Sequence, residues 1–346
     1  MRREFLKSAA AIAAGVATFG LAGAASAQDA AEFYDGNVIK WIVPYDPGGG
    51  YDEYTRVILP YFEKYSGARV DIINMPGSGG MKGAVEIFNS PADGTYIGIV
   101  NGSALVTNQL AEIAGADYKL SEYSWIGRIV ADPRVFVAAA NSGIESFEGL
   151  QGDGETAIVG ATGLGGSTYV DAVIIGEAFG IDQRVIHGFD RSGDIRTAML
   201  RGDVDAMWGS LGSALDGIAS GDHEIILHAE RDSDLPELQG KPNIFELAAE
   251  LEDSERAMRI LEAWEGLSAV GRPVVGPPGV PEDRLAFLRD ALEQAIMDPE
   301  FRAQSEEAGR DLSYASGEDM QRIARSATEL EDDLMELFVA AIRGEI

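Results

Sequence analysis

Four short segments of the sequence combine glycine with hydroxyl-bearing or aromatic residues, and they carry the clearest chemistry in the chain. They run over residues 43–52, 74–80, 101–103 and 160–168. Glycine lets backbone amides approach a ligand with no Cβ in the way, and free amides at the start of a helix attract anions. A single loop of this kind is explained equally well by a tight turn. Four of them together favour an anion site, with a carboxylate as ligand.

The candidate binding residues lie in these loops and at two later positions. Side-chain hydroxyls add donors to the backbone amides. Aromatic rings at strand ends can wall a pocket, with core packing as the alternative for each. Asp52 is suited to cap the helix after the first loop. The other candidates are Tyr45, Pro47, Gly48, Gly49, Gly50, Tyr51, Gly77, Ser78, Gly79, Ser103, Thr162, Gly165, Gly166, Ser167, Thr168, Asp190, Arg191 and Trp208.

The sequence lacks the usual carriers of enzyme chemistry. It contains no G-x-S-x-G, no G-x-x-x-x-G-K-[ST] and no G-x-G-x-x-G motif. Its histidines, His187, His223 and His228, do not have the spacing of zinc ligands. We therefore expect no catalytic residue, no metal and no cofactor.

The loops must be held by elements that alternate along the chain. Short β-branched runs are each followed by a glycine or small polar residue and then by a helical pattern, which predicts sheets covered by helices, with the loops at one edge. The expected strands are 38–45, 68–74, 96–101, 134–140, 156–161, 184–187 and 204–208. The expected helices begin near Asp52, Gly80, Ser103, Ser146, Ser167, Ser192 and Ser210.

The last third of the chain reads differently. An acidic helical stretch over 243–267 leads into an expected strand and a Pro/Gly turn over 272–281. Helices are predicted over 281–297, 299–309 and 318–343. The last has one apolar stripe at three- and four-residue spacings, and its acidic run at 329–333 is interpreted as a solvated face.

Composition and charge exclude several classes of protein. There are 27 Lys and Arg against 57 Asp and Glu, a formal charge of −30, which disfavours nucleic acid and anionic membrane surfaces as partners. With no cysteine the chain has no disulfide and no thiolate ligand. Hydrophobic residues make up 46% of the chain, enough for a sizeable core.

The first 27 residues have the pattern of a cleaved export signal. Two arginines open an R-R-x-F-L-K sequence at 2–7, an Ala/Gly-rich stretch follows, and Ala25-Ser26-Ala27 forms a small-x-small cleavage site. A membrane anchor is the alternative, but glycines interrupt the apolar stretch. We expect a periplasmic protein exported by a signal of twin-arginine type.

The ordered motifs resemble those of the Bug family, the TctC-like extracytoplasmic substrate-binding proteins of tripartite tricarboxylate transporters. The resemblance is carried by I-V-P-Y, P-G-G-G and Asp52 in the first loop, then by P-G-S-G-G at 76–80 and P-A-D-G-T-Y at 91–96. Later matches are S-F-E-G-L at 146–150, the loop at 163–168, R-G-D-V-D at 201–205 and P-P-G-V-P at 277–281. It spans nearly the whole chain after the signal.

The resemblance implies an α/β protein with the two-lobed fold of type II periplasmic binding proteins, each lobe a mostly parallel sheet flanked by helices. Lobe 1 is expected over 28–131 plus 229–346, and lobe 2 over 132–228. It also implies a hinged cleft that closes on a small-molecule carboxylate, and docking of a monomer on membrane permease subunits.

Departures from the family pattern leave the solute open. The loop after the second-lobe strand reads G-F-D-R-S-G-D at 188–194, where many members have tyrosine, lysine and glycine. Tyr169 stands in place of a common histidine, and Tyr51 in place of a smaller residue. Arg191 could pair with a distal carboxylate of the ligand, or could be a solvated arginine beside Asp190 and Asp194.

Two other functions stay open from the sequence. A sensory receptor would pass its bound state to a signalling partner instead of a permease. An exported hydrolase or lyase on the same scaffold would turn over its carboxylate. The solute itself could be a C4-dicarboxylate, a citrate-like acid, an aromatic acid or an amino acid.

Overall fold

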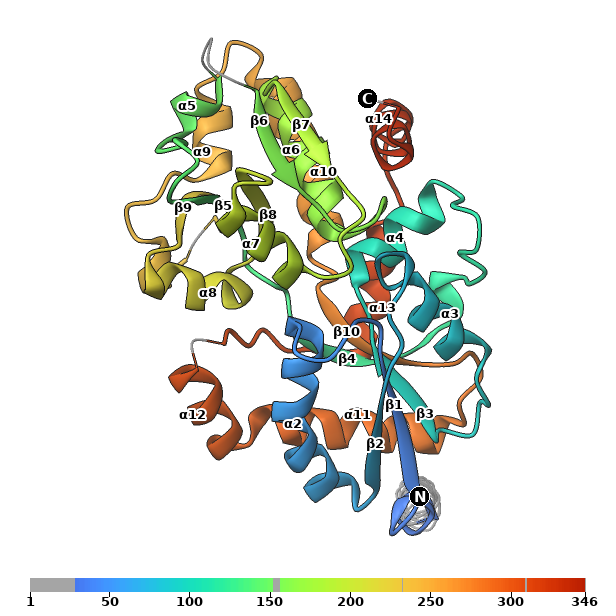
Figure 1. The fold of residues 1–346 in the computed structure, drawn as a ribbon. Coiled ribbons are helices and arrows are strands. Elements are labelled where there is room, and N and C mark those ends of the chain that lie inside the picture. The colour runs from blue at the N-terminus through green and yellow to red at the C-terminus, as the bar shows by residue number, and fades with distance from the viewer. Residues whose placement is uncertain (1–28, 152–155, 232, 309, 346) are drawn as a thin grey trace, which may run out of the picture.

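The chain forms two α/β lobes around two separate sheets, as expected (Figure 1). The computed structural model describes residues 29–151, 156–231, 233–308 and 310–345. The expected export signal at 1–27 lies outside the described residues. Among the helices in the described ranges, none has the length and apolar content needed to cross a membrane.

Sheet A lies in the lower lobe of Figure 1 and has six strands. β1 pairs in parallel with β2 and β3, whereas β10 runs antiparallel to β3 and β4, and β11 runs antiparallel to β4. In spatial order the strands are β11 (Ala315–Ser316), β4 (Ser124–Val130), β10 (Arg272–Gly276), β3 (Tyr96–Ile99), β1 (Val38–Val43) and β2 (Arg69–Asn74).

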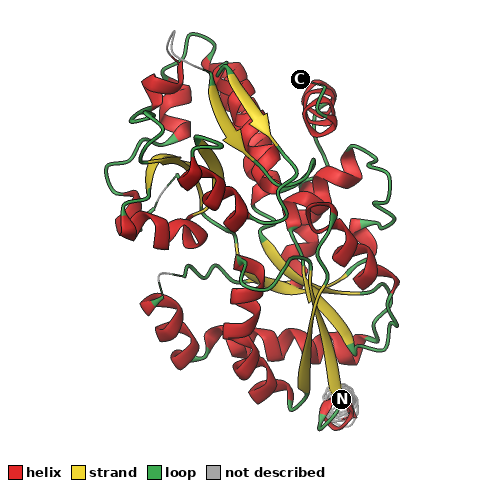
Figure 2. Cartoon of the chain, in the orientation of Figure 1, coloured by secondary structure: helices red, strands yellow, loops and turns green. Residues whose placement is uncertain are grey.

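Sheet B forms the upper lobe and has five strands (Figure 2). β6 is parallel to β7 and β8, and β5 is antiparallel to β8 and β9. Both sheets are therefore mixed, where mostly parallel sheets were expected. In spatial order the strands are β7 (Gln183–Ile186), β6 (Ala157–Gly160), β8 (Ala206–Ser210), β5 (Arg134–Ala139) and β9 (His223–His228).

Helices begin close to most of the predicted positions, because each follows a short loop at the end of a strand. Several start one or two residues away from the predicted residue. The helices are α2 (Gly50–Ser66), α3 (Met81–Asn89), α4 (Gly102–Leu110), α5 (Phe147–Gln151), α6 (Ser167–Phe179), α7 (Ser192–Arg201), α8 (Leu211–Ser220), α9 (Ile244–Ala249), α10 (Ser254–Ser268), α11 (Glu282–Met297), α12 (Pro299–Glu307), α13 (Gly317–Ser326) and α14 (Asp332–Arg343).

The single C-terminal helix predicted over 318–343 is wrong, because the chain breaks between α13 and α14. α13 packs on β4, whereas α14 contacts both α4 and α6. The acidic run lies at the start of α14, where it favours the helix dipole. Arg259 binds Glu331 and Asp333 there, so these two acids are paired and not only solvated.

The sheets are joined in a way that places the working loops between them. The chain passes from β4 to β5 through residues 131–133, and returns from β9 to β10 through α9 and α10. Loops after β1, β2 and β3 leave one edge of sheet A, and loops after β6, β7 and β8 leave one edge of sheet B. Both edges face the space between the lobes (Figure 1).

Candidate functional site

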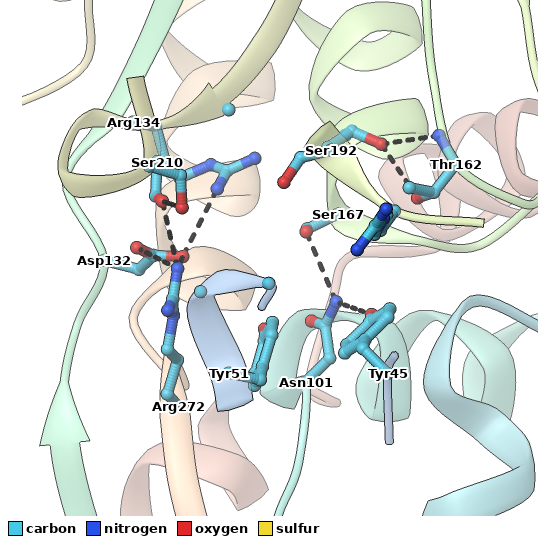
Figure 3. A pocket seen from close by; sticks show the side chains of 16 residues that line it. Tyr45, Tyr51, Asn101, Asp132, Arg134, Thr162, Ser167, Ser192, Ser210 and Arg272 are labelled. Atoms are coloured by element: carbon cyan, nitrogen blue, oxygen red, sulfur yellow. Dashed lines mark hydrogen bonds and ion pairs between the residues drawn. The ribbon is translucent and has the colours of Figure 1, made fainter. Parts of the chain in front are cut away.

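A cavity of about 50 Å³ lies between the lobes, at the edges where these loops emerge. Figure 3 shows its walls: tyrosine and asparagine side chains from the sheet A side on the floor, with serines and arginines around them. The lining residues are Tyr45, Gly49, Gly50, Tyr51, Asn101, Asp132, Arg134, Thr162, Ser167, Thr168, Arg191, Ser192, Gly209, Ser210, Ser213 and Arg272.

Five helices begin at this cavity, and one of them, α4, is capped by the Asn101 side chain. The N-cap residues of the other four are Gly49 for α2, Gly166 for α6, Arg191 for α7 and Ser210 for α8, and none of these caps accepts a hydrogen bond from its helix through its side chain. The first-turn amides of an uncapped helix retain donor capacity and partial positive charge. The cavity is therefore surrounded by donors that suit an anion.

Arg272 is the most unusual group in the cavity wall. It lies at the start of β10 and is 3% exposed. Its Nη2 donates to Asp132 at 2.9 and 3.1 Å and to Ser210 Oγ at 3.0 Å, whereas Nε and Nη1 are buried without a hydrogen-bond partner in the described structure. A buried donor without a partner is costly. An anion in the cavity would satisfy it.

The protonation of Arg272 is secured by its surroundings. Burial alone would lower the pKa of Arg272, but the carboxylate of Asp132 and the rings of Tyr51 and Tyr54 raise it above its usual value. The guanidinium lies over these two rings at 4.5 and 4.8 Å from their centroids. Arg272 is thus a fixed positive charge.

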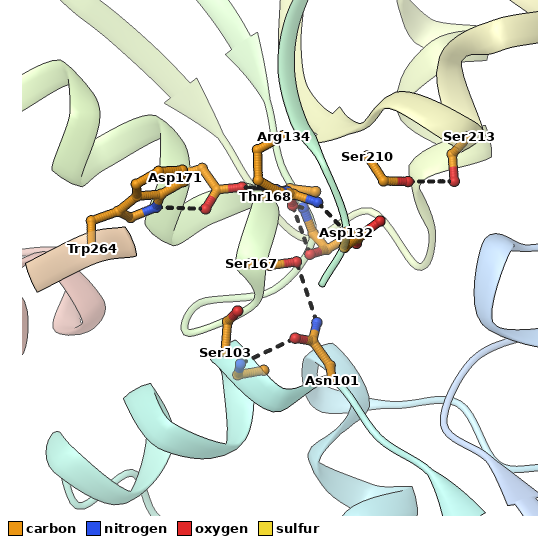
Figure 4. A network of polar contacts seen from close by, with 12 residues as sticks. Asn101, Ser103, Asp132, Arg134, Ser167, Thr168, Asp171, Ser210, Ser213 and Trp264 are labelled. Atoms are coloured by element: carbon orange, nitrogen blue, oxygen red, sulfur yellow. Dashed lines mark hydrogen bonds and ion pairs between the residues drawn. The ribbon is translucent and has the colours of Figure 1, made fainter. Parts of the chain in front are cut away.

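A second arginine, Arg134, is held in a closed network (Figure 4). Its Nε donates to Asp171 at 2.8 Å and its Nη2 donates to the same carboxylate. Its Nη1 donates to Asp132 at 3.3 Å, and the indole of Trp264 donates to Asp171 at 2.9 Å. Burial raises the pKa of Asp171, although Arg134 and Trp264 oppose this rise. Arg134 and Arg272 therefore balance the two carboxylates of Asp132 and Asp171 in charge, and all of these groups except Asp171 line the cavity.

The floor of the cavity is aromatic and hydrogen bonded. The rings of Tyr45 and Tyr51 lie 4.7 Å apart. Tyr45 Oη donates to Gly79 O at 2.7 Å and accepts from Asn101 Nδ2 at 2.8 Å. Burial raises the pKa of Tyr45 to about 12, and it raises that of Tyr51 well above its usual range. Both hydroxyls are neutral at physiological pH.

Contacts between the lobes close the cavity. Asn101 Nδ2 donates to Ser167 Oγ at 3.3 Å, and Arg191 Nη1 donates to Pro47 O at 3.0 Å. Thr107 Oγ1 donates to Gly165 O at 2.9 Å. The structure therefore shows a closed cleft.

Eight of the predicted site residues line the cavity. They come from the first loop, from the loop before α6 and from the start of α7, and are Tyr45, Gly49, Gly50, Tyr51, Thr162, Ser167, Thr168 and Arg191. Thr162 and Thr168 hydrogen bond to each other at 2.9 Å. The glycine-rich loops of both lobes thus meet at one place.

The remaining candidates lie outside the cavity lining. Gly77, Ser78 and Asp190 are exposed. Ser103 donates to Leu267 O at 3.3 Å, next to the cavity floor. Trp208 is buried against Phe136 and Trp264 at centroid distances of 5.5 and 6.5 Å, as its core-packing alternative predicts.

The remaining candidates hold the loops through backbone hydrogen bonds and do not line the cavity; they are Pro47, Gly48, Gly79, Gly165 and Gly166. The expected capping role of Asp52 is also corrected. Asp52 lies in the first turn of α2, and Gly49 is the N-cap. Its carboxylate accepts hydrogen bonds from Gly48 N at 2.9 Å, Arg56 Nε at 2.7 Å and Asn74 Nδ2 at 3.0 Å, and so fixes the first loop.

Eight lining residues were not among the candidates. One available signal was a charged residue at the first position of an otherwise apolar strand, which holds for Arg134 and Arg272. Another signal was position, because Asn101 lies in the predicted loop at 101–103, and Ser192 and Ser210 are predicted helix starts. The other three missed residues had no distinctive sequence pattern. The missed residues are Asn101, Asp132, Arg134, Ser192, Gly209, Ser210, Ser213 and Arg272.

Comparison with known proteins gives two related sequences. No family model matches the chain. A UPF0065 protein encoded in the tcbD–tcbE intergenic region of Pseudomonas sp. strain P51 is 24% identical over 299 residues, which cover 84% of this chain and 83% of that protein. Protein BugT of Bordetella pertussis is 30% identical over 136 residues, 39% of this chain and 40% of BugT.

Solved structures extend the similarity to the whole fold. The periplasmic binding protein BugD superposes with a TM-score of 0.72 at 18% identity, covering 88% of this chain and 97% of BugD. MatC of Rhodopseudomonas palustris with bound malate superposes with a TM-score of 0.69 at 17% identity, and the match covers 87% of this chain and 99% of MatC. A second R. palustris protein, with adipate, superposes with a TM-score of 0.72 at 17% identity, and the match covers 87% of this chain and 97% of that protein. This chain is thus similar in sequence to part of BugT and has the two-lobed α/β fold seen in periplasmic binding proteins such as BugD.

Proposed function

We propose that the protein is an exported solute receptor that captures a carboxylate in the cleft between its lobes. The observation that carries the proposal is the buried Arg272, whose Nη1 and Nε have no partner in the described structure and which lies beside the uncapped start of α2. A guanidinium and helix-terminal amides are the donors that proteins use for carboxylates. The structures with malate and adipate show that this fold binds such ligands in other proteins.

We further propose that the receptor works in the periplasm as a monomer and delivers its solute to the permease of a tripartite tricarboxylate transporter. The relation to BugT and the fold shared with BugD support this placement. The lobes would open by a hinge motion at the two chain crossings, which are residues 131–133 and the segment that follows β9. Ligand that touches both lobes would then favour the closed form, because only differential affinity shifts such an equilibrium.

Binding without turnover fits the chemistry of the cavity better than catalysis does. Its serines have no histidine or lysine beside them among the described lining residues, so none has a general base. The carboxylate of Asp132 is engaged by two arginines. A sensing role would use the same site, and association with permease subunits in membrane fractions would distinguish transport from sensing.

The test is calorimetry with a panel of carboxylic acids, each paired with its uncharged amide. We expect at least one acid to bind and its amide not to bind, with the acid recovered unchanged after incubation. Small-angle scattering should show a smaller radius of gyration for the bound protein than for solute-free protein. Binding of no acid, or of acid and amide alike, would refute carboxylate capture.

A further inference from the structure

Charge and size in the closed cavity define the solute more narrowly, if the proposed function holds. We propose that the solute is a short monocarboxylate with a hydroxyl or oxo group, of the size of glycolate, lactate or pyruvate. Its carboxylate would bind Arg272, and its second oxygen would lie near the hydroxyls at the start of α6. This class has one negative charge, whereas malate and adipate, seen in related folds, have two.

The first argument is the count of available positive charge. Of the three arginines that line the cavity, Arg134 uses all three of its nitrogen groups on Asp171 and Asp132. Arg191 has a 39% exposed side chain and is bound to Asp194 through Nε and to Pro47 O through Nη1. Arg272 alone among them has buried, unpartnered nitrogens. One carboxylate can therefore pair with a buried guanidinium, whereas a second would have only hydroxyls, helix-terminal amides and the partly exposed Arg191 as donors.

The second argument is size. The closed cavity holds about 50 Å³, and a water molecule needs about 10–15 Å³ measured in this way, so about three to five water-sized groups fill it, which suits an acid of two or three carbons. The lobe 2 side of the cavity is in close contact with the lobe 1 side, so the cavity cannot become larger unless the cleft opens. A Cβ added to Gly79 would lie 3.5 Å from Gly166 across the lobes, and one added to Gly50 would lie 2.7 Å from Ser213 Oγ.

The third argument is the distribution of donors and apolar surface. Ser213 Oγ accepts from Ser210 at 2.8 Å, so its own proton is free to point to a carboxylate held by Arg272. Ser167 Oγ accepts from Asn101 and can likewise donate to a ligand hydroxyl or oxo group. The Tyr51 ring also lines the cavity and gives it apolar surface that suits a methyl or methylene group.

The test is competitive calorimetry on the full exported chain after its solute has been removed. Acetate, glycolate, lactate and pyruvate form one series, and malonate, malate and adipate form the other. We expect glycolate, lactate or pyruvate to bind at least tenfold more tightly than acetate and than every dicarboxylate. Arg191→Met should leave the ratio of lactate to malate affinity within about twofold, because Arg191 is not a ligand group for either acid.

The contrary outcomes separate the two proposals. If malate or adipate binds as tightly as lactate, and Arg191→Met weakens only the dicarboxylate, Arg191 takes a second carboxylate. The monocarboxylate assignment is then overturned while carboxylate capture stands. Acetate binding as tightly as lactate would overturn the role of the second oxygen. If no acid of either series binds but another acid of the wider panel does, only the monocarboxylate assignment fails. Carboxylate capture itself fails if no acid of the wider panel binds.

Discussion

Replacement of Arg272 by methionine tests the anion site most directly. Methionine keeps much of the length and the apolar stem of arginine but removes the charge and every donor. Asp132 keeps Arg134 as a partner, and two buried unpartnered nitrogens disappear. The free energy of unfolding of the solute-free protein should therefore fall, but by less than the roughly 3–5 kcal/mol that breaking a buried ion pair usually costs.

Solute affinity should fall steeply in the same variant. Removing one member of a buried, hydrogen-bonded charge pair costs about 2–5 kcal/mol, or roughly 30-fold to several thousand-fold in Kd at about 1.4 kcal/mol per factor of ten. We expect about 100-fold, because the amides at the start of α2 remain. Arg272→Lys should lose less, since it keeps the charge, but it cannot serve both Asp132 and the solute in the fork geometry of arginine.

The assay is titration calorimetry with the tightest acid found for the wild type. Arg128→Met is the matched control, because Arg128 lies on β4 beside β10 and its guanidinium donates to Ser313 O and Ala269 O, outside the cavity. Its substitution should leave Kd within about twofold of the wild type. Equal affinity of Arg272→Met and wild type would show that the carboxylate binds elsewhere.

Three further predictions follow from other contacts. Gly50→Ala should weaken binding about tenfold, because its methyl would lie 2.7 Å from Ser213 Oγ and 2.8 Å from Arg272 Nη1. The control in calorimetry is Gly49→Ala, whose methyl would meet only the carbonyl oxygen of Asp46 at 3.6 Å. Equal effects of the two substitutions on Kd would contradict the closed geometry. Asp132→Asn should lower the Tm of the solute-free protein but raise its affinity for the solute several-fold, because the carboxylate that competes for Arg134 and Arg272 is lost. A loss of solute affinity together with the loss of Tm would contradict this competition. A hydrogen bond from Lys64 lowers the pKa of Asp298, so this pair stabilises the fold fully above the unfolded carboxyl pKa of about 4, and the stabilisation is lost gradually as pH falls below that value towards the lowered folded pKa. The loss of Tm caused by Asp298→Asn should be largest at pH 7 and shrink steadily from about pH 4 to about pH 2 in scanning calorimetry, and a loss that does not depend on pH would refute the linkage.

The sequence predicts the loops of the site because the physics of a βα unit is local. A β-branched run ending in glycine places its loop at the carboxyl edge of a sheet, and such edges hold binding sites in α/β proteins. Gly49, Gly50, Thr162 and Ser167 were found in this way, although they lie in different lobes. The break before α14 was missed because the apolar stripe of α13 continues in register across it, and only tertiary contacts separate the two helices.

The charged part of the site was missed for the opposite reason. Asp132, Arg134 and Arg272 lie up to 140 residues apart, and they meet because β4 and β10 are antiparallel neighbours, with Arg272 paired to Val130 in register. β4 itself was not predicted, so nothing in the sequence pattern brought these residues together. Non-local antiparallel pairing carries no periodic signal along the chain.

The position of these residues links binding to closure. Asp132 lies where the chain crosses from sheet A to sheet B, and its φ of 77° is unusual for a residue other than glycine. Its carboxylate joins Arg272 on β10 to Arg134 on β5. These groups are at the crossing, so we expect them to keep their geometry when the lobes separate, whereas the hydroxyls of Ser167 and Ser213 would move away with lobe 2. An arriving carboxylate would then meet Arg272 and the start of α2 first, and the serines would complete its shell as the cleft closes. A strongly acidic protein can bind an anion in this way because the attraction is short-range and buried, where neither its own net charge nor salt acts strongly.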